Sequence, residues 1–208
     1  MAENKLVVIN AALRALGETE VENVQQSDAA SSLDDAWDDA RRELLSDYYW
    51  PFAVKRATLV AASPVLTTEE ALEWDYAYDL PNDWLRTNEL SHSGDFRHGL
   101  IADWAFENNR ILCDHTPVYI RYVFDNEELT SWDAKFDAAM AYQLALTSNL
   151  QITNSRALTA DLDTLLTGKR YAARAKNARD QQPRQRPEGT WNKSRRGSRK
   201  LQGGWGQF

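Results

Sequence analysis

Hydrophobic residues at the start of the chain recur every three or four positions, which is the spacing of one helix face. They are Leu6, Ile9, Leu13 and Leu16, and Gly17 follows where a left-handed residue can end the helix. After a polar loop, Ser27 or Asp28 can cap a second helix. Its apolar stripe consists of Leu33, Trp37, Ala40, Leu44 and Tyr48, and Pro51 prevents continuation. This part of the sequence therefore predicts two helices.

The period changes to two in the middle of the chain, which is typical of strands with one buried face. Large apolar side chains alternate with smaller or polar ones in residues 73–80, at Trp74, Tyr76, Tyr78 and Leu80. Pro81, Asn82 and Asp83 predict a turn after this strand. Residues 100–106 and 110–113 predict a hairpin, because Asn108 and Asn109 tolerate the positive φ of a tight turn. A further strand is indicated by Val118, Ile120, Tyr122 and Phe124.

Helical spacing returns after residue 130. One stripe is Phe136, Met140, Leu144, Thr147 and Gln151, preceded by Thr130-x-x-Asp133 as a candidate capping box. Asn154 or Ser155 can cap the next helix, whose stripe is Leu158, Leu162 and Leu165. The pattern allows this helix to continue beyond Gly168 as a basic, alanine-rich extension, and Pro183 and Pro187 are expected to end it.

Together these elements predict an α+β protein, with a helical bundle of about four helices, an inserted small antiparallel β module and an extended C-terminal tail. The helical domain is expected to combine residues 1–52 with 130–182, and the β module to occupy 53–129. Residues 183–208 form the predicted tail, because no core-forming pattern remains there. The four amphipathic helices are expected to pack on one another, since their apolar stripes need a partner.

Charge divides the chain into two unlike parts. The 208 residues include 24 Lys and Arg and 31 Asp and Glu, which gives a net charge of -7. Residues 169–208 contain 12 of the basic residues but only Asp180 and Glu188 as acids, so the preceding part has 12 basic and 29 acidic residues. This acidic body argues against a protein that coats nucleic acid, because phosphate binding needs cationic surface. Only the tail has that composition.

Several polar residues are candidates for a metal site or a reactive group. Asp34 and Asp38, like Asp35 and Asp39, are four apart and share helix faces, but a solvated acidic face offset by Arg41 and Arg42 is favoured over a cation site. His92, His98 and His115 lack the spacing of metal ligands and are interpreted as surface histidines. Cys113 lies in an apolar stretch and is expected to be a buried free thiol.

No motif points to an enzyme. The sequence has no glycine-rich phosphate loop, no G-x-S-x-G, no C-x-x-C, and no pair of carboxylates singled out for glycoside hydrolysis. We expect no catalytic residue, no cofactor and no metal. The start of the sequence has no signal-peptide pattern and no apolar run has the length of a membrane span, so the chain is expected to be made in the cytoplasm without membrane contact.

Aromatic residues give the tail a second distinctive feature. Core packing accounts for most of the eight Trp and eight Tyr, including Trp37, Trp74, Tyr76, Trp104 and Tyr122. The tail aromatics stand among arginines without a core, which favours a peptide that docks on a folded partner over an arm that stacks on nucleic-acid bases. The candidate docking residues are Arg184, Arg186, Trp191, Lys193, Arg195, Arg196, Arg199, Lys200, Leu201, Trp205 and Phe208.

Four segments, taken in order, resemble the head-to-tail adaptor proteins of tailed bacteriophages, the family of packaged-DNA stabilisation, tail accessory and tail tubular proteins. They are N-A-A-L-R-A-L-G-E at 10–18, R-R-E-L-L with the W-P-F-A that follows at 41–53, Y-A-Y-D-L-P-N-D-W at 76–84 and F-D-A-A-M-A-Y-Q-L-A at 136–145. These segments and the stretches between them span about two-thirds of the chain. Each segment alone is weakly specific, and their succession is more specific.

The resemblance implies a structural virion protein that forms a ring of about twelve copies below the portal. Such a ring would seal packaged DNA, connect the capsid to the tail or its nozzle protein, and let DNA pass without sequence-specific binding. The implied location is the virion neck. No tail residue matches a family motif, so docking of the tail on the portal is inferred from its charge. Two alternatives stay open: a DNA-binding protein that uses the basic tail, and a peptidoglycan hydrolase carried in the virion.

Overall fold

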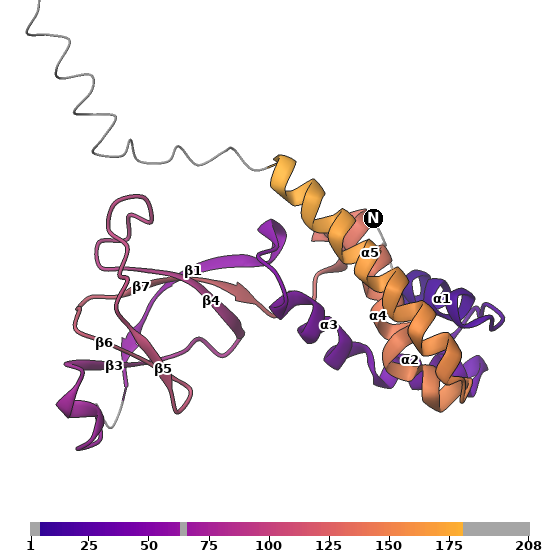
Figure 1. Ribbon diagram of the computed structural model, residues 1–208, viewed down its shortest axis with the longest axis horizontal. Helices are drawn as coiled ribbons and strands as arrows, with labels where there is room; N and C mark the ends of the chain where they lie inside the picture. Colours follow the sequence, from indigo (N-terminus) through magenta and orange to yellow (C-terminus); the bar gives the residue numbers. More distant parts are fainter. Residues whose placement is uncertain (1–4, 63–65, 181–208) are drawn as a thin grey trace, which may run out of the picture. The chain divides into compact units, whose positions relative to one another are not determined.

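The computed structural model describes residues 5–62 and 66–180, and it combines α-helices with antiparallel sheets (Figure 1). The α+β class predicted from the sequence is therefore confirmed. The chain divides into two compact units, one up to Asn177 and one from Ala178 onward. The first unit contains the helices and both sheets, except for the last three residues of the final helix.

Five α-helices form within the described residues. They are α1 (Lys5–Leu16), α2 (Asp28–Asp35), α3 (Trp37–Ser46), α4 (Ala134–Ile152) and α5 (Arg156–Asp180). Helix α1 ends as its sequence predicts, because Gly17 adopts φ +82° and the Glu18 N–H donates to the Leu13 carbonyl at 2.9 Å. Helix α2 begins at the predicted cap, where the Ser27 hydroxyl accepts from the Ala30 N–H.

The second predicted helix is two helices in the structure. Ala36 separates α2 from α3, and α3 ends at Ser46 rather than near Pro51. The early end has a tertiary cause: the indole of Trp50 is completely buried, and its Nε1–H donates to the Leu44 carbonyl at 2.9 Å. Satisfying that buried donor folds the chain back on the helix that it leaves.

The predicted start of α4 needs a correction. Thr130 does not form a capping box, because its hydroxyl donates to the Glu128 carboxylate. Asp133 is the N-cap residue instead, and its carboxylate accepts from the Lys135 N–H at 2.8 Å. A carboxylate at this position also suits the positive end of the helix dipole.

Helix α5 keeps the predicted cap and extension. The Ser155 hydroxyl accepts from the Leu158 N–H, and the helix runs through Gly168 to Asp180. Its predicted stripe is wrong at one position, because Leu165 is 48% exposed and Leu166 is buried instead. The two residues that were expected to end this helix, Pro183 and Pro187, lie outside the described residues.

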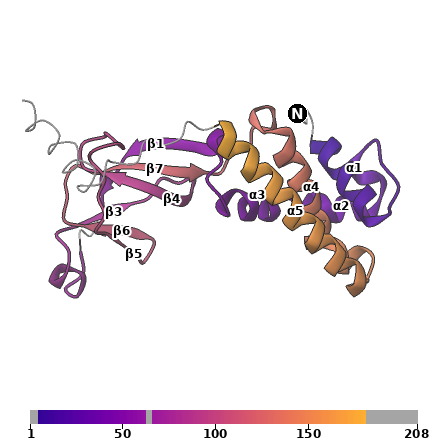
Figure 2. The same cartoon turned by 45° about the horizontal axis from the view of Figure 1, so that its top comes forward.

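The core of the helices is built around α4, which contacts α1, α2 and α3 (Figures 1 and 2). Three aromatic side chains at its N-terminal end, Trp50, Trp132 and Phe136, are completely buried. The Phe136 ring meets both indoles edge to face, with centroids 4.9 Å away in each case. The Trp132 indole also stacks on Trp37 at 6.0 Å, so α3 and α4 share this cluster.

The part of the chain that connects α3 to α4 forms two antiparallel sheets. Sheet A has the order β1 (Val54–Thr58), β7 (Tyr119–Phe124) and β4 (Trp84–Ser91). Sheet B has the order β2 (Val60–Ala61), β3 (Tyr76–Asp79), β6 (Arg110–Cys113) and β5 (Ala105–Glu107). Residues from both sheets, among them Tyr78, Ile111, Ile120 and Tyr122, share one buried apolar cluster.

The strand predictions hold where the sequence alternates regularly. The turn between β5 and β6 is the predicted asparagine pair, with φ of 45° at Asn108 and 60° at Asn109. The strand expected over residues 100–106 is confined to β5, although Leu100 forms one isolated bridge with Ser91.

The longest strand among the described residues, β4, was not predicted from the sequence. Its pairing with β7 shifts register between Trp84 and Arg86 and again between Thr87 and Glu89. Each shift interrupts the alternation of inward and outward side chains, so the period of two is hidden in the sequence.

The aromatic predictions are confirmed to different degrees. Trp37 and Tyr122 are buried, with exposed fractions of 3% and 4%. Trp74, Tyr76 and Trp104 are only half-buried, and they pack at the borders of the apolar clusters in the β module.

Candidate functional site

All eleven docking residues predicted from the sequence, from Arg184 to Phe208, lie outside the described residues. The basic segment to which they belong begins earlier, however, on helix α5. Five of its basic residues, Lys169, Arg170, Arg174, Lys176 and Arg179, are within the described part of that helix. Their contacts show how the positive charge of this helix is used.

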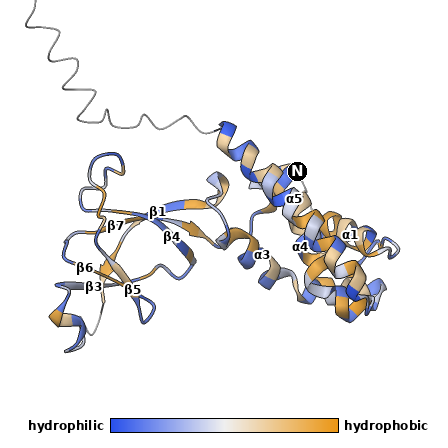
Figure 3. Ribbon diagram, in the orientation of Figure 1, coloured by the Kyte–Doolittle hydropathy of each residue, from blue (hydrophilic) through white to orange (hydrophobic). Residues whose placement is uncertain are grey.

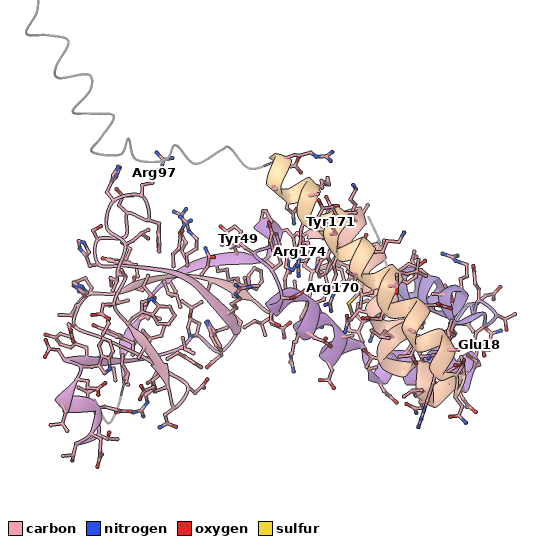
Figure 4. All side chains as sticks on the ribbon, viewed as in Figure 1. Glu18, Tyr49, Arg97, Arg170, Tyr171 and Arg174 are labelled. Atoms are coloured by element: carbon pink, nitrogen blue, oxygen red, sulfur yellow. The ribbon has the colours of Figure 1, made fainter. Side chains whose placement is uncertain are left out.

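Arg170 and Arg174 hold α5 against the end of α3 (Figure 4). The Arg170 guanidinium donates to the Gln143 side chain at 2.6 Å and lies 3.5 Å from the Asp47 carboxylate. Arg174 forms an ion pair with the same carboxylate, and its guanidinium lies 5.3 Å from the centroid of the Tyr48 ring. We name Asp47, Tyr48, Gln143, Arg170 and Arg174 the α5 anchor.

Two lysines on the same helix are also engaged. The Lys169 ammonium lies 5.4 Å from the centroid of the Tyr142 ring on α4, and Lys176 forms an ion pair with the capping carboxylate of Asp133. Tyr171, by contrast, is 75% exposed. Arg170, Arg174 and Lys176 therefore neutralise acidic residues of the body and belong to the fold rather than to a free cationic surface.

We expect removal of the α5 anchor to loosen the helix without unfolding the protein. Half-exposed ion pairs contribute modestly, so the double change Arg170→Met and Arg174→Met should lower hydrogen-exchange protection of α5 amides by about tenfold. Amides of α1 should keep their protection. Arg179→Met is the matched control, since Arg179 is exposed and lies one turn beyond the anchor. Equal loss in α1 and α5 would contradict a local anchor.

A second charged cluster connects the helices to the β module. The side chain of Arg41, on α3, is only 4% exposed. Its Nε and Nη2 donate to the two oxygens of Asp125 at 2.9 and 3.1 Å, and Nη2 also lies 3.2 Å from the Glu127 carboxylate. Its Nη1 donates to Asp38 at 2.7 Å, and Arg42 donates to Asp125 at 2.8 Å. We name Asp38, Arg41, Arg42, Asp125 and Glu127 the junction cluster.

The charge state of Asp125 follows from these contacts. Burial alone would raise the pKa of its carboxyl group, but the hydrogen bonds and positive charges of Arg41 and Arg42 outweigh burial and lower the pKa. Asp125 directly follows β7, while Arg41 lies on α3, so the bidentate pair fixes the end of sheet A on the helices.

Two further contacts reinforce this junction. The Arg86 guanidinium, on β4, donates to the carbonyls of Ser46 and Asp47 at the C-terminal end of α3. The Asn126 amide donates to the Phe52 carbonyl at 3.0 Å and to the Ser131 hydroxyl at 2.8 Å. Both points where the chain passes between helices and strands are therefore tied by hydrogen bonds.

The acidic face of α2 and α3 is solvated, as predicted. Asp34 pairs with Lys5 at 2.6 Å, and Asp38 pairs with Arg41 but remains 64% exposed. Arg42 donates to Asp125, and the hydrogen bond and charge of Asp125, followed by the charges of Asp38 and Asp39, raise the pKa of Arg42, so this arginine also offsets the acidic face as predicted. Over residues 5–62 and 66–180, no group of three or more His, Cys, Asp or Glu side chains is placed to hold a metal ion.

The histidines and the cysteine occupy the environments that the sequence indicates. His92, His98 and His115 are exposed; His92 stacks on His115, and His98 lies 2.9 Å from the Asp95 carboxylate. Cys113 is a buried free thiol in the β-module core, where burial raises the pKa of the thiol. A raised pKa leaves the thiol protonated, which fits a packing role.

Sequence reasoning missed the residues that hold the structure together by charge. Arg41 and Asp125 are 84 positions apart, and Asp47 and Arg174 are 127 apart, so no local spacing could pair them.

Among the described residues, no helix is long and apolar enough to cross a membrane. Neither a scan against protein-family models nor a search of curated proteins finds a match to this chain.

Proposed function

We propose that this protein is a head-to-tail adaptor of a tailed bacteriophage, a structural virion protein that forms a ring of about twelve copies below the portal. In this role it seals packaged DNA and connects the capsid to the tail. Its partners would be the portal protein, further copies of the chain, the tail or nozzle protein, and DNA that passes without sequence-specific contact. The proposal rests first on the order of the four adaptor-like segments along the sequence.

The architecture supports this proposal. A subunit of a ring must present separate surfaces to neighbours above, below and beside it. The chain combines helices packed on α4 with a β module inserted between α3 and α4, and the junction cluster ties the two together. The finer arrangement that we propose is a helical bundle with an inserted module and an extended C-terminal segment that docks on the portal.

One observation carries the docking proposal. The described basic residues of α5 are largely engaged with the body, at Lys169, Arg170, Arg174 and Lys176. The cationic charge available for a partner therefore lies beyond that helix, where residues 183–208 have seven Lys and Arg against Glu188 alone. The aromatic residues Trp191, Trp205 and Phe208 in that segment supply anchors of the kind that dominate docking energies.

Portal-dependent assembly tests the proposal. At about 150 mM salt, where long-range attraction is screened, we expect the chain to join its portal protein in a ring and to form no ring alone. Light scattering after size-exclusion chromatography would measure the masses. A variant that ends at Asp180 should keep its helical circular dichroism, because the unit up to Asn177 has its own core, but should lose assembly. An unchanged mass in the mixture of the full chain and portal would contradict the proposal.

The full chain and the variant that ends at Asp180 also distinguish an adaptor from a DNA-binding protein. A DNA-binding tail predicts an affinity for duplex DNA that falls steeply with salt and disappears when residues 181–208 are removed. It also predicts that added portal protein leaves the measured mass of this protein unchanged. The hydrolase alternative predicts cleared bands on a peptidoglycan gel, where the adaptor predicts none.

A further inference from the structure

One side of helix α5 is buried and the opposite side is exposed. The buried residues of this helix are Leu162, Leu166, Ala173 and Asn177. Because an α-helix has about 3.6 residues per turn, positions three, four or seven apart around Gly168 form the side that points away from them. We name these positions the outer face of α5; they are Asp161, Thr164, Leu165, Gly168, Tyr171, Ala172 and Ala175. The first five are exposed and the two alanines are half-buried.

The outer face carries two large apolar side chains among small ones. Leu165 is 48% exposed, and Tyr171, which is labelled in Figure 4, is 75% exposed. The other uncharged residues of this face are threonine, glycine and alanine. Figure 3 shows hydrophobic and hydrophilic residues mixed along this helix. The outer face therefore has two projections separated by hollows, which is a shape that a second helix can match.

Gly168 lies at the middle of the outer face, and no contact among the described residues requires a glycine there. Glycine is less favourable than alanine in the interior of a helix. A Cβ atom at this position would meet nothing within 4 Å, so one copy of the protein has room for a side chain. A glycine does allow another backbone to approach closely. The position therefore suits contact with a helix of another molecule.

The charges of α5 favour a second α5 in antiparallel orientation. Residues 156–168 contain two acids and one base, whereas residues 169–180 contain five bases and one acid. An antiparallel pair places the acidic half of each helix beside the basic half of the other. Asp161 of one copy then lies beside Lys176 of the second copy. The Lys176 side chain remains 40% exposed although it pairs with Asp133, so a second carboxylate can reach it.

The shape of the outer face matches itself in the same orientation. When two copies of α5 cross at Gly168, a two-fold axis passes between the two glycines. Positions at similar distances before and after Gly168, on the same side of the face, then meet across the axis. Leu165 meets Ala172 of the second copy, and Tyr171 meets Thr164 of the second copy. Each large side chain therefore packs against a small one.

We propose that two copies of this protein pair through the outer face of α5, with the two helices antiparallel and crossing at Gly168. Such a contact uses the same surface on both copies and closes at two. It therefore differs from a contact that repeats around a ring, and it goes beyond the proposed function, so either proposal can fail without the other. A single helix pair lies at the low end of interface sizes, below about 1,200 Å² in total, and the dimer should be weak and reversible.

Sedimentation equilibrium of the full chain tests the pairing. We expect an equilibrium between monomer and dimer that depends on concentration. Gly168→Leu should weaken dimerisation about tenfold or more, because two leucines would fill the crossing point. The same change should keep or raise the thermal midpoint, since leucine favours a helix and has room in one copy. Thr167→Leu is the matched control, because Thr167 is exposed but lies about 100° around the helix. It should leave dimerisation unchanged.

Cysteine cross-linking tests the two-fold geometry. A disulfide needs Cα atoms about 4.4 to 6.8 Å apart, and helices that cross at Gly168 bring the two copies of that residue together. Gly168→Cys should therefore give cross-linked dimers under mild oxidation, whereas Thr167→Cys should not; the native Cys113 is buried.

Four results would overturn the proposal. They are a wild-type chain that stays monomeric, a Thr167→Leu variant impaired as much as Gly168→Leu, the absence of a Gly168→Cys cross-link, and assembly into species larger than a dimer that Gly168→Leu abolishes. If the wild-type chain is monomeric and only its joining to the portal is lost in Gly168→Leu, the portal covers this face instead of a second copy.

Discussion

Replacing Arg41 with methionine is expected to lower the free energy of unfolding by about 3 kcal/mol. The substitution keeps most of the side-chain volume but leaves Asp125, whose side chain is 13% exposed, without its bidentate partner. An ionised carboxylate in that position loses two charge-assisted hydrogen bonds and cannot regain full hydration. Urea denaturation followed by circular dichroism would measure the change.

The partner substitution separates charge pairing from packing. Asp125→Asn alone should also destabilise, because it removes the bidentate carboxylate and leaves only the exposed carboxylates of Asp38 and Glu127 to neutralise the buried guanidinium of Arg41. The double variant Arg41→Met with Asp125→Asn should cost less than the sum of the two single variants, since it removes both charges of the buried pair and the charges that lose a partner, on Asp38, Arg42 and Glu127, are exposed. If the losses of stability in the two single variants simply added up in the double variant, the two side chains would act independently, which would contradict the pairing of Arg41 with Asp125.

Acidification provides a second measure of the same pair. The folded-state pKa of Asp125 is lowered below its unfolded value, which is about 3.9 for an aspartate, so its stabilisation is present above that pH. It is lost as the pH falls through the lower folded-state value. The stability difference between the wild-type chain and Asp125→Asn should therefore shrink below about pH 4.

Replacing Trp132 with alanine should be about as damaging, with an expected loss of about 3 to 5 kcal/mol. The indole is completely buried between Trp37 and Phe136, and its Nε1–H donates to the Asn126 carbonyl. Truncation removes a large apolar surface and leaves a cavity between α3 and α4 that the packed helices cannot fully close. Denaturant unfolding would again give the magnitude.

Two variants control for this prediction. Trp132→Phe should cost less than Trp132→Ala, because it keeps an aromatic ring in the cluster. Trp104→Ala should also cost less, since Trp104 is only half-buried at the border of the β-module core. If Trp104→Ala proved as damaging as Trp132→Ala, the helical aromatic cluster would not be the dominant core of the protein.

Periodic sequence signals account for the elements that were predicted correctly. The stripe of α1 fits its observed helix, and Asn108-Asn109 forms the hairpin turn that its sequence predicts. In α4 the first three predicted positions, Phe136, Met140 and Leu144, are buried, but Thr147 and Gln151 are exposed. These signals succeed because they act locally: a helix face, a cap or a turn needs only residues a few positions apart. The α+β class followed from their order along the chain.

The misses occur where a contact made outside the helix or strand itself overrides the local pattern. Helix α3 stops early because Trp50 folds back on the Leu44 carbonyl, and β4 escaped prediction because its register shifts against β7. Leu165 and Leu166 both fit an apolar stripe, and only packing decides which is buried. In each case the deciding partner lies on another element or beyond a turn, where sequence periodicity carries no information.

The sequence by itself determined the class of fold, the acidic body, and the concentration of arginine and tryptophan after residue 180, because composition and short-range spacing need no partner. Only the tertiary structure decided how charge is used inside the body. It joined Arg41 to Asp125 and Arg174 to Asp47 across 84 and 127 positions, and it showed that Arg170, Arg174 and Lys176 of α5 pair with acidic residues of the body. Ion pairs of this kind form between helices and strands that are distant in the sequence, and only the packing of the folded chain brings their charged side chains together.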